Sequence, residues 1–181
     1  MPQFVAFLRA VNVGGRFVRM EDLRKMFADL GFAQVETFIQ SGNVFFSSPD
    51  EDAPGLEKRI EAHLAQALGY AVMTFLRTPG ELAAIAGYAP FPSPLAATDT
   101  LYVSFLKEHP ISEAQQKMLA LANPVDEFHF HGRELYWLRH SALGESVFTN
   151  AILEKLLRAP ATNRNITTVK KMAAKRSSGG G

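Results

Sequence analysis

Apolar residues along this chain follow two spacings, the alternation typical of strands and the three-to-four-residue repeat typical of helices. A β-prone run at 4–11 is followed by a helical repeat at 20–30. Residues 35–48 contain two further apolar runs, and the Gly42-Asn43 pair between them is typical of a hairpin turn. The pattern therefore predicts a strand, a helix and a β-hairpin, in that order.

The next segments complete this first group of elements. Residues 56–68 place apolar side chains on one helical face, and residues 70–77 form another β-prone run. The resulting order, β-α-β-β-α-β, is that of the split βαβ or ferredoxin-like arrangement. A short helix at 79–86 then leads to a proline-rich stretch within 88–99, which is the best candidate for a linker.

The same order of elements begins again after the linker. We expect a strand at 100–107, a helix at 112–122, a hairpin at 125–138 and a helix at 145–157. The opening strands of the two groups match at an offset of 98 residues, and the hairpins match at an offset of 90. The sequence thus predicts an α+β fold of two ferredoxin-like halves, related by a diverged internal duplication, plus a C-terminal helix.

The end of the second group differs from the end of the first. Residues 161–172 have the pattern of a capped helix where a fourth strand would be expected. The predicted organisation is a first half at 1–87, a linker at 88–99, a second half with the C-terminal helix at 100–176 and a flexible tail at 177–181.

The first predicted hairpin is apolar on both faces. With Gly42-Asn43 as a two-residue loop, Ile39 pairs with Phe46, and apolar residues point to both sides of the ribbon. We therefore expect the first sheet to be covered on both sides, because a large exposed apolar patch would favour association.

The second predicted hairpin has one polar and one apolar face. A turn at 132–133 pairs His131 with Glu134 and His129 with Tyr136, and these four side chains share the polar face. We therefore expect this face to meet water.

Composition limits the chemistry and the location. The 181 residues are 47% hydrophobic and 20% charged, which suits a soluble globular protein with a sizeable core. The chain has no cysteine, which excludes thiolate nucleophiles, disulfides and cysteine-based metal sites and suits a reducing compartment. Its first residues have the pattern of neither a membrane span nor a signal peptide. We expect a cytoplasmic protein with no membrane contact.

Charge is unevenly placed, although the formal net charge is only +1. No acidic residue follows Glu154, whereas six arginine and lysine residues lie between 158 and 176. Such a segment either attracts anions or forms the solvated face of a helix.

Three ordered motifs carry a resemblance to a known family. They lie at 7–15, 39–44 and 162–165 and have the sequences FLRAVNVGG, IQSGNV and TNRN. Together they resemble the bacterial DUF1697 family over nearly the whole chain. The resemblance implies a compact α/β protein with duplicated ferredoxin-like halves, and it implies no established activity. The family usually has tryptophan after its Arg-Asn pair, where this chain has Ile166.

The candidate ligand-binding residues lie at three places. Residues 12–16 join a strand to a helix, and their glycines can let backbone N–H groups approach an anion while arginine adds charge. The stretch 162–165 places an arginine at a predicted helix start, which suits a carboxylate or a phosphate. With the hairpin tip, the candidates are Arg9, Asn12, Gly14, Gly15, Arg16, Ser41, Asn43, Asn163, Arg164 and Asn165.

Each of these places also has a purely structural explanation. The glycines can serve a turn that needs positive φ, the stretch 162–165 can cap a helix, and the tip at 40–43 can satisfy turn chemistry alone. We also expect the tip and the first strand–helix loop at opposite ends of the sheet. On that expectation Ser41 and Asn12 share no site within one half.

The other residue groups in the sequence do not predict a metal site, a cofactor site or a catalytic nucleophile. His129 and His131 share a strand face, but no third ligand is placed beside them, so we expect no metal. The loop at 12–16 matches neither a complete dinucleotide-binding fingerprint nor a Walker A sequence, so we expect no cofactor. Neither Ser41 nor Ser141 lies in a nucleophile elbow. Catalytic residues stay unassigned, and the sequence leaves open whether the protein is an enzyme.

These observations predict a protein that binds a small phosphate- or nucleotide-like anion in a cleft between the two halves, where residues 12–16 and 163–165 come together. The alternative is a nucleic-acid binding module that uses open aromatic sheet faces and the basic C-terminal helix. Salt distinguishes the two, because ionic strength steeply weakens contacts that follow a nucleic-acid backbone. The sequence does not set the oligomeric state.

Overall fold

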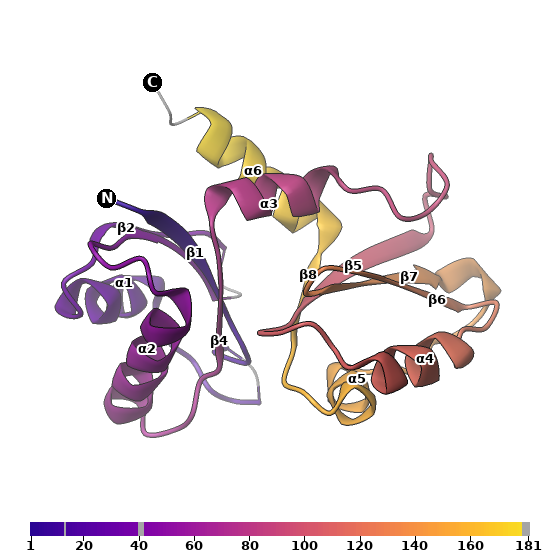
Figure 1. Cartoon of the computed structure of the whole chain (residues 1–181), viewed down its shortest axis with the longest axis horizontal. Coiled ribbons are helices and arrows are strands. Elements are labelled where there is room, and N and C mark those ends of the chain that lie inside the picture. The colour runs from indigo at the N-terminus through magenta and orange to yellow at the C-terminus, as the bar shows by residue number, and fades with distance from the viewer. Residues whose placement is uncertain (13, 40–41, 179–181) are drawn as a thin grey trace. The chain divides into compact units, whose positions relative to one another are not determined.

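The computed structural model describes residues 1–12, 14–39 and 42–178. The chain forms two compact units, Met1–Leu82 and Ala83–Gly181, each built on an antiparallel sheet of its own (Figure 1). The boundary falls inside a helix, α3 (Pro79–Gly87), which precedes the predicted linker. The role of residues 88–99 as a linker stays a prediction.

The first unit contains a four-stranded antiparallel sheet with the strand order β2-β3-β1-β4. Two helices cover one face of this sheet (Figure 1). In chain order the elements are β1 (Gln3–Leu8), α1 (Met20–Asp29), β2 (Ala33–Thr37), β3 (Asn43–Ser47), α2 (Ala53–Leu68) and β4 (Thr74–Arg77). The order of elements expected from the sequence is therefore confirmed for this unit.

Alternation along the strands builds the core of the first unit. Phe4 and Leu8 of β1 belong to the cluster that packs under the two helices, and both are buried. Phe46 of β3 stacks on Phe32 with 4.5 Å between ring centroids and meets Phe27 of α1 edge-on at 5.5 Å. Each large apolar side chain buried in this way stabilises the fold by roughly 1.5–3 kcal/mol. This apolar face therefore determines which side of the sheet the helices cover.

The register of the first hairpin differs from the predicted one. Thr37 pairs with Val44, so Ile39 lies in the connecting loop and is 52% exposed instead of pairing with Phe46. All residues of β3 are buried, as its two apolar faces suggested. Because both faces are apolar, no alternation in the sequence indicates which residues pair, and the predicted register is wrong.

Side chains from α2 close the free edge of β4. Glu57 Oε1 accepts a hydrogen bond of 2.9 Å from Leu76 N, and Glu61 Oε1 accepts one of 2.9 Å from Thr74 N. The two carboxylates lie one helical turn apart and face successive outward N–H groups of the strand. They therefore satisfy backbone donors that an edge strand would otherwise present to another chain.

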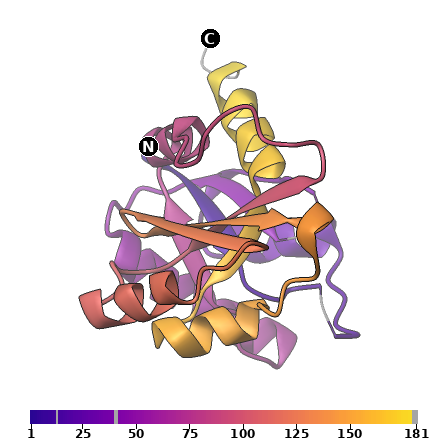
Figure 2. The same cartoon turned by 90° about the vertical axis from the view of Figure 1, so that its right-hand side faces the viewer.

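The second unit also contains a four-stranded antiparallel sheet, with the strand order β6-β7-β5-β8. After α3 its elements are β5 (Asp99–Phe105), α4 (Ser112–Ala120), β6 (Asp126–His131), β7 (Glu134–His140), the 3₁₀ helix η1 (Ser141–Leu143), α5 (Asn150–Leu157), β8 (Thr162–Asn165) and α6 (Ile166–Ser178). Figure 2 shows α4 and α5 on one face of this sheet and α6 on the other. Counted from the first strand of each unit, the two sheets have the same strand order.

The face under α4 and α5 carries an aromatic core. Trp137, Phe128 and Phe148 lie with 4.9–6.5 Å between their ring centroids. Trp137 Nε1 donates a hydrogen bond of 2.9 Å to Asp126 Oδ1, so the buried ring nitrogen has an acceptor. The apolar face predicted for the second hairpin is thus the core face of this unit.

The opposite face of the second hairpin is covered, which the sequence did not predict. Its register is the expected one, with His129 opposite Tyr136 and His131 opposite Glu134. The expectation that this face meets water is wrong for the inner strand, because Tyr136 is 0% exposed and Glu134 is 7% exposed. Tyr136 O–H donates a hydrogen bond of 3.0 Å to Ile85 O of α3. Helix α3, which precedes the second group of elements in the chain, therefore covers the face of the second hairpin that alternation alone predicts to be polar.

The end of the second unit differs from the predicted helix. Residues 162–165 form β8, which pairs antiparallel with β5, and α6 begins only at Ile166. A short polar strand has no apolar alternation of its own, so its pairing is decided by tertiary structure. The preceding helix is also shorter than expected, since α5 begins at Asn150 after its cap, Thr149, and not at residue 145.

Two side chains of the last helix are buried. Val169 and Met172 are 0% exposed, while Lys170 and Lys171 between them are exposed. The helix continues to Ser178, so the predicted tail at 177–181 begins inside it, and the last three residues lie outside the described part. Within the described residues, no helix has both the length and the apolar character needed to cross a membrane.

Replacing Glu57 by alanine should lower the free energy of unfolding by about 1–3 kcal/mol, because the buried Leu76 N–H would lose its acceptor. Lys58→Ala, on the exposed side of the same helix, is the matched control and should change stability by less than about 0.5 kcal/mol. Urea denaturation of the two variants measures both effects. Equal stability of the two variants would show that the edge of β4 does not depend on this carboxylate.

Candidate functional site

The loop after β1 and the tip of the first hairpin lie side by side. β1 and β3 pair antiparallel with Phe7 opposite Asn43, so β3 begins where β1 ends. Leu8 N, at the end of β1, donates a hydrogen bond of 2.8 Å to Gly42 O, which holds the start of the β1–α1 loop (residues 9–19) beside the tip. The expectation that the loop and the tip lie at opposite ends of the sheet is therefore wrong. Ser41 itself lies outside the described residues.

Two residues of the tip serve this junction. Gly42 has a φ of +80°, and a Cβ at this position would lie 3.1 Å from Leu8 Cβ, so a larger residue would be both strained and crowded. Asn43 is 0% exposed, and its Nδ2 donates a hydrogen bond of 3.0 Å to Phe38 O. The predicted ligand residue Asn43 thus has a structural part in closing the hairpin.

Hydrogen bonds hold the β1–α1 loop at both ends. Asn12 Oδ1 accepts a hydrogen bond of 2.7 Å from Val18 N, which closes the loop on itself. Tyr70 O–H donates to Val11 O at 3.4 Å, and Arg9 N donates at 2.9 Å to a backbone oxygen of the segment before β4. Asn12 therefore determines the shape of the loop from inside it.

Left-handed backbone conformations gather around this junction. Gly14 and Gly15 have φ values of +64° and +81°, and a Cβ at either position would meet nothing within 4 Å. These two glycines serve the backbone conformation and not close packing. Ala10 and Ile39 have φ values of +58° and +59°, a conformation that costs a non-glycine residue about 1–3 kcal/mol. Both glycines have the positive φ that the turn explanation needs, and two non-glycine residues near them are strained.

The β1–α1 loop is cationic, with three arginines and no acidic residue. Arg9 is half-buried where the loop leaves the sheet, and Arg16 is exposed, with its guanidinium carbon 4.2 Å from the centroid of the Tyr70 ring. Arg19 pairs with Asp22 at 2.8 Å, and this hydrogen bond lowers the pKa of the Asp22 carboxyl. Arg9 and Arg16 therefore give the glycine-bearing part of the loop its positive charge.

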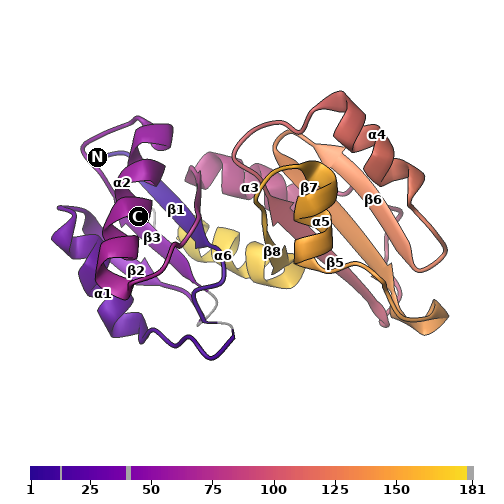
Figure 3. The same ribbon diagram turned by 90° about the horizontal axis from the view of Figure 1, so that it is seen from below.

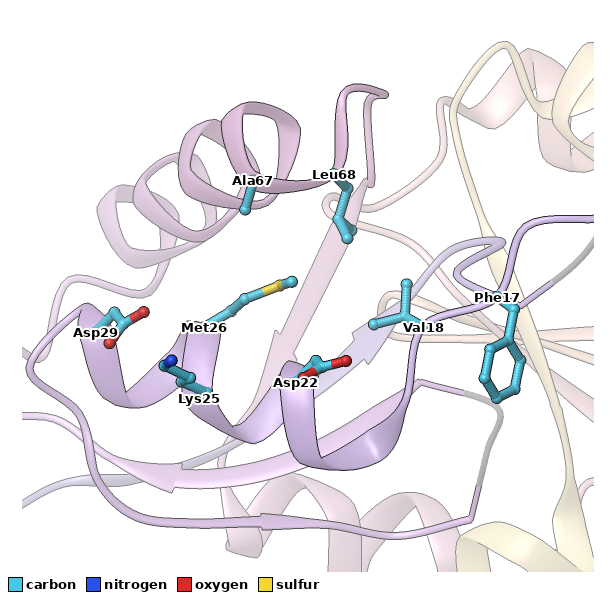
Figure 4. Close-up of a pocket in the computed structure, with 8 residues that line it drawn as sticks. All are labelled: Phe17, Val18, Asp22, Lys25, Met26, Asp29, Ala67 and Leu68. Carbon is cyan, nitrogen blue, oxygen red and sulfur yellow. The ribbon is translucent and has the colours of Figure 1, made fainter.

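A hollow of about 330 Å³ lies next to this loop, between α1 and the end of α2 (Figure 4). The residues lining it are Phe17, Val18, Asp22, Lys25, Met26, Asp29, Ala67 and Leu68. Its walls are apolar, while two carboxylates and one amine supply its charge. None of the predicted ligand residues that the structure describes lines it. The sequence does not predict this hollow, because it forms between elements that are far apart in the chain. The one sequence feature that points to it is Phe17, an apolar residue in a glycine-bearing loop.

The predicted site residues of the second unit lie on β8. Ser104 Oγ donates a hydrogen bond to Asn163 Oδ1 across the sheet. Asn165 Oδ1 accepts a hydrogen bond of 2.9 Å from Thr167 N at the start of α6. Both asparagines therefore have structural parts, in strand pairing and in capping a helix, and their ligand-binding role stays a prediction.

Arg164 is a buried cation, 7% exposed. Its Nη1 donates hydrogen bonds of 2.8 Å to Thr162 Oγ1 and to Asn163 O. Burial lowers the pKa of Arg164 to about 10, so the guanidinium stays charged at neutral pH. Arg164 thus lies buried within β8 and not at the helix start expected from the sequence, and its ligand-binding role stays a prediction.

The two histidines of β6 contact an aromatic ring. Tyr88 Oη and His129 Nε2 lie 2.7 Å apart, and the His131 ring stacks on the Tyr88 ring with 3.8 Å between centroids. Among the described residues, no group of three or more histidine, aspartate or glutamate side chains is placed to hold a metal ion. These contacts fasten the segment after α3 to the edge of the second sheet.

A third histidine lies between two carboxylates on neighbouring strands. His140 Nδ1 is 3.0 Å from Asp99 Oδ1 of β5, and His140 Nε2 is 2.5 Å from Glu127 Oε2 of β6. Hydrogen bonds to Glu127 and then to Asp99 raise the pKa of His140 above its ordinary value. Because both ring nitrogens face carboxylates, the imidazolium acts as a cross-strand link and not as a free base.

Comparisons with known proteins agree with this architecture. The model of a family described as a protein of unknown function (DUF1697) matches residues 1–136, which confirms the predicted resemblance. The structure of the conserved bacterial protein SP0830 from Streptococcus pneumoniae is similar over 98% of this chain and 99% of that chain, with a TM-score of 0.76 and 22% sequence identity. At this identity the likeness shows the fold alone. No curated protein matches the chain.

The His140 link should make stability depend on pH. Since the folded pKa is raised, the link stabilises fully below about pH 6.5, the ordinary histidine pKa, and its contribution is lost as pH rises through the folded pKa. The free energy of unfolding of wild type should exceed that of His140→Gln by roughly 1 kcal/mol at pH 6. The difference should shrink as the pH rises through the folded pKa. Urea unfolding across pH 6–9, with His109→Gln as control, measures it. A difference independent of pH would refute the assignment.

Proposed function

This chain belongs to the DUF1697 family, and we propose that it binds a small phosphate- or nucleotide-like anion at its β1–α1 loop. The observation that carries the proposal is the exposed left-handed pair Gly14 and Gly15 beside Arg9 and Arg16, in a loop without a carboxylate. Successive backbone N–H groups in turn conformations of this kind form a concave set of donors for an anion. The loop thus combines fixed backbone dipoles with positive side chains.

Each loop residue has its own part in the proposed site. Gly14 and Gly15 supply backbone donors, while Arg9 and Arg16 supply charge. Asn12 holds the loop in shape through its hydrogen bond to Val18 N. A loop that is already fixed loses less conformational entropy when a ligand binds, which favours affinity. Ser41, Asn43, Asn163, Arg164 and Asn165 stay predicted ligand contacts.

Backbone strain supports a function at this end of the first sheet. Ala10 and Ile39 hold left-handed conformations on either side of the junction between Leu8 and Gly42. Strain of this kind is retained where the surrounding structure enforces it, and it clusters at ligand sites. A purely structural turn would be more stable with glycine at both positions.

We also propose that both units have the ferredoxin-like fold and descend from one duplicated ancestor. Their shared strand order supports this relation. So does a second junction equivalent to the first, in which Leu106 N donates a hydrogen bond of 3.0 Å to Arg133 O at the tip of the other hairpin. The expected offset between the two opening strands brings Leu8 onto Leu106.

The nucleic-acid alternative has one observation in its favour, the exposed lysines Lys170, Lys171 and Lys175 on α6. The aromatic residues that would stack on bases argue against it. Phe46 and Trp137 are 1% and 4% exposed and belong to the cores of their units. A nucleic-acid module built on this chain would therefore depend on charge alone.

Isothermal titration calorimetry with ADP, pyrophosphate and inorganic phosphate as ligands tests the proposed anion site. Arg16→Gln should raise the dissociation constant for the ligand that binds by roughly tenfold, the equivalent of one charge-assisted hydrogen bond. Lys58→Gln removes an exposed charge from α2 and should leave affinity unchanged.

The titrations are repeated at 50 and 200 mM salt, with a short RNA duplex as a fourth ligand. A pocket with one or two ion pairs should lose little affinity over this range, whereas backbone tracking loses orders of magnitude. Equal affinity of Arg16→Gln and wild type, or binding of the duplex alone with a steep salt dependence, would contradict the proposal.

A further inference from the structure

The second unit contains a hollow of its own, which shares no lining residue with the β1–α1 loop. It measures about 310 Å³ and lies between the loop after β5 (residues 106–111) and the end of α5. Ile111 and Leu157 form part of an apolar wall, and Pro160 lines it as well. The hollow is therefore large enough for a small organic molecule and has surface that an apolar group can cover.

Charged groups around this hollow are mainly positive. Lys107 and Arg158 line it, against one carboxylate, Glu108. Arg158 has only a loose partner, since its Nη2 lies 3.6 Å from a carboxylate oxygen of Glu113 and both side chains are more than half exposed. An exposed ion pair of this kind contributes little stability, so the guanidinium can exchange its partner for a ligand at small cost.

The backbone at Arg158 makes its presence there unusual. Arg158 is the C-cap of α5, with φ +54° and ψ +35°, and its N–H bonds to Glu154 O. The C-cap of α2 in the first unit has the same left-handed conformation and the same type of hydrogen bond, to Ala65 O, but the residue there is Gly69. Glycine is the ordinary residue at such a cap because a side chain is strained in this region. The second unit thus keeps an arginine where the fold favours glycine.

Each unit has a hollow at the end of its second sheet-covering helix, although the first extends along α1 and the second along the loop after β5. In each, the last residue of the second helix lines it, Leu68 in one unit and Leu157 in the other. The first hollow has Asp22 and Asp29 against Lys25, whereas the second is predominantly basic. Arg158, at the rim of the second hollow, is strained where glycine would be more stable. A role in ligand binding explains its presence better than a role in stability does.

We propose that the hollow of the second unit binds a small organic anion, a phosphate or carboxylate that carries an apolar group. Arg158 and Lys107 bind the anionic head, and Ile111 and Leu157 cover the apolar part. This site is independent of the proposed function, because it uses no residue of the β1–α1 loop.

Phenyl phosphate is a suitable probe, with phenol and inorganic phosphate as the two half-ligands. In ¹⁵N NMR titrations of the full chain, phenyl phosphate should shift the amide signals of residues 107–109 and 157–159 at lower concentration than either half-ligand. Shifts confined to residues 9–19 would support the loop site and overturn this one, so the two proposals fail separately.

Arg158→Gly separates binding from stability. It should raise the dissociation constant for phenyl phosphate roughly tenfold, through loss of one charge-assisted hydrogen bond, while the melting temperature stays level or rises because glycine suits this conformation. Lys155→Ala removes a positive charge from the exposed side of the same helix and should change neither value. Unchanged affinity in Arg158→Gly, or an equal loss in Lys155→Ala, would overturn the proposal.

Discussion

In each unit one backbone hydrogen bond ties the chain at the end of the first strand to the tip of the hairpin. Leu8 N–H donates to Gly42 O in the first unit, and Leu106 N–H donates to Arg133 O in the second. Both bonds follow from the antiparallel pairing of the first and third strands of each sheet, which sets the end of one strand beside the beginning of the other. The positions of the glycine loop and of the strained residues around it depend on this pairing.

The sequence predicted most elements and one of the two hairpin registers. The two hairpins differ in whether polar and apolar residues alternate along them. The second hairpin alternates polar and apolar residues around Gly132, so its register must keep Phe128, Phe130 and Trp137 together on one face. The first hairpin is apolar on both faces and offers no such signal, and Ile39, which the pattern assigns to a strand, lies in the loop. β8 was missed because a short polar strand is recognised only by its neighbour, here β5.

The candidate site was predictable only where it is local in sequence. The sequence predicts residues 12–16 as a loop, because a strand, two glycines and a helix follow each other directly, whereas Arg9 falls in the predicted strand and lies in the loop. The hollows at the helix ends were not predicted, since each joins a loop to a helix terminus some fifty residues away. Arg158 gave no signal either, because a left-handed cap is expected from glycine and not from arginine. Stability explains Gly69, whereas Arg158 calls for a functional explanation.

Native-state hydrogen exchange at the Leu8 and Leu106 amides tests the central claim most directly. If each amide is bonded to its hairpin tip, both should exchange as slowly as the interiors of their sheets, through opening of the whole unit and not through local fraying. The exposed Gly15 amide provides the fast reference within the same spectrum. Exchange of Leu8 or Leu106 at the rate of Gly15 would show that the loop and the hairpin tip are not joined in solution, and it would contradict the account.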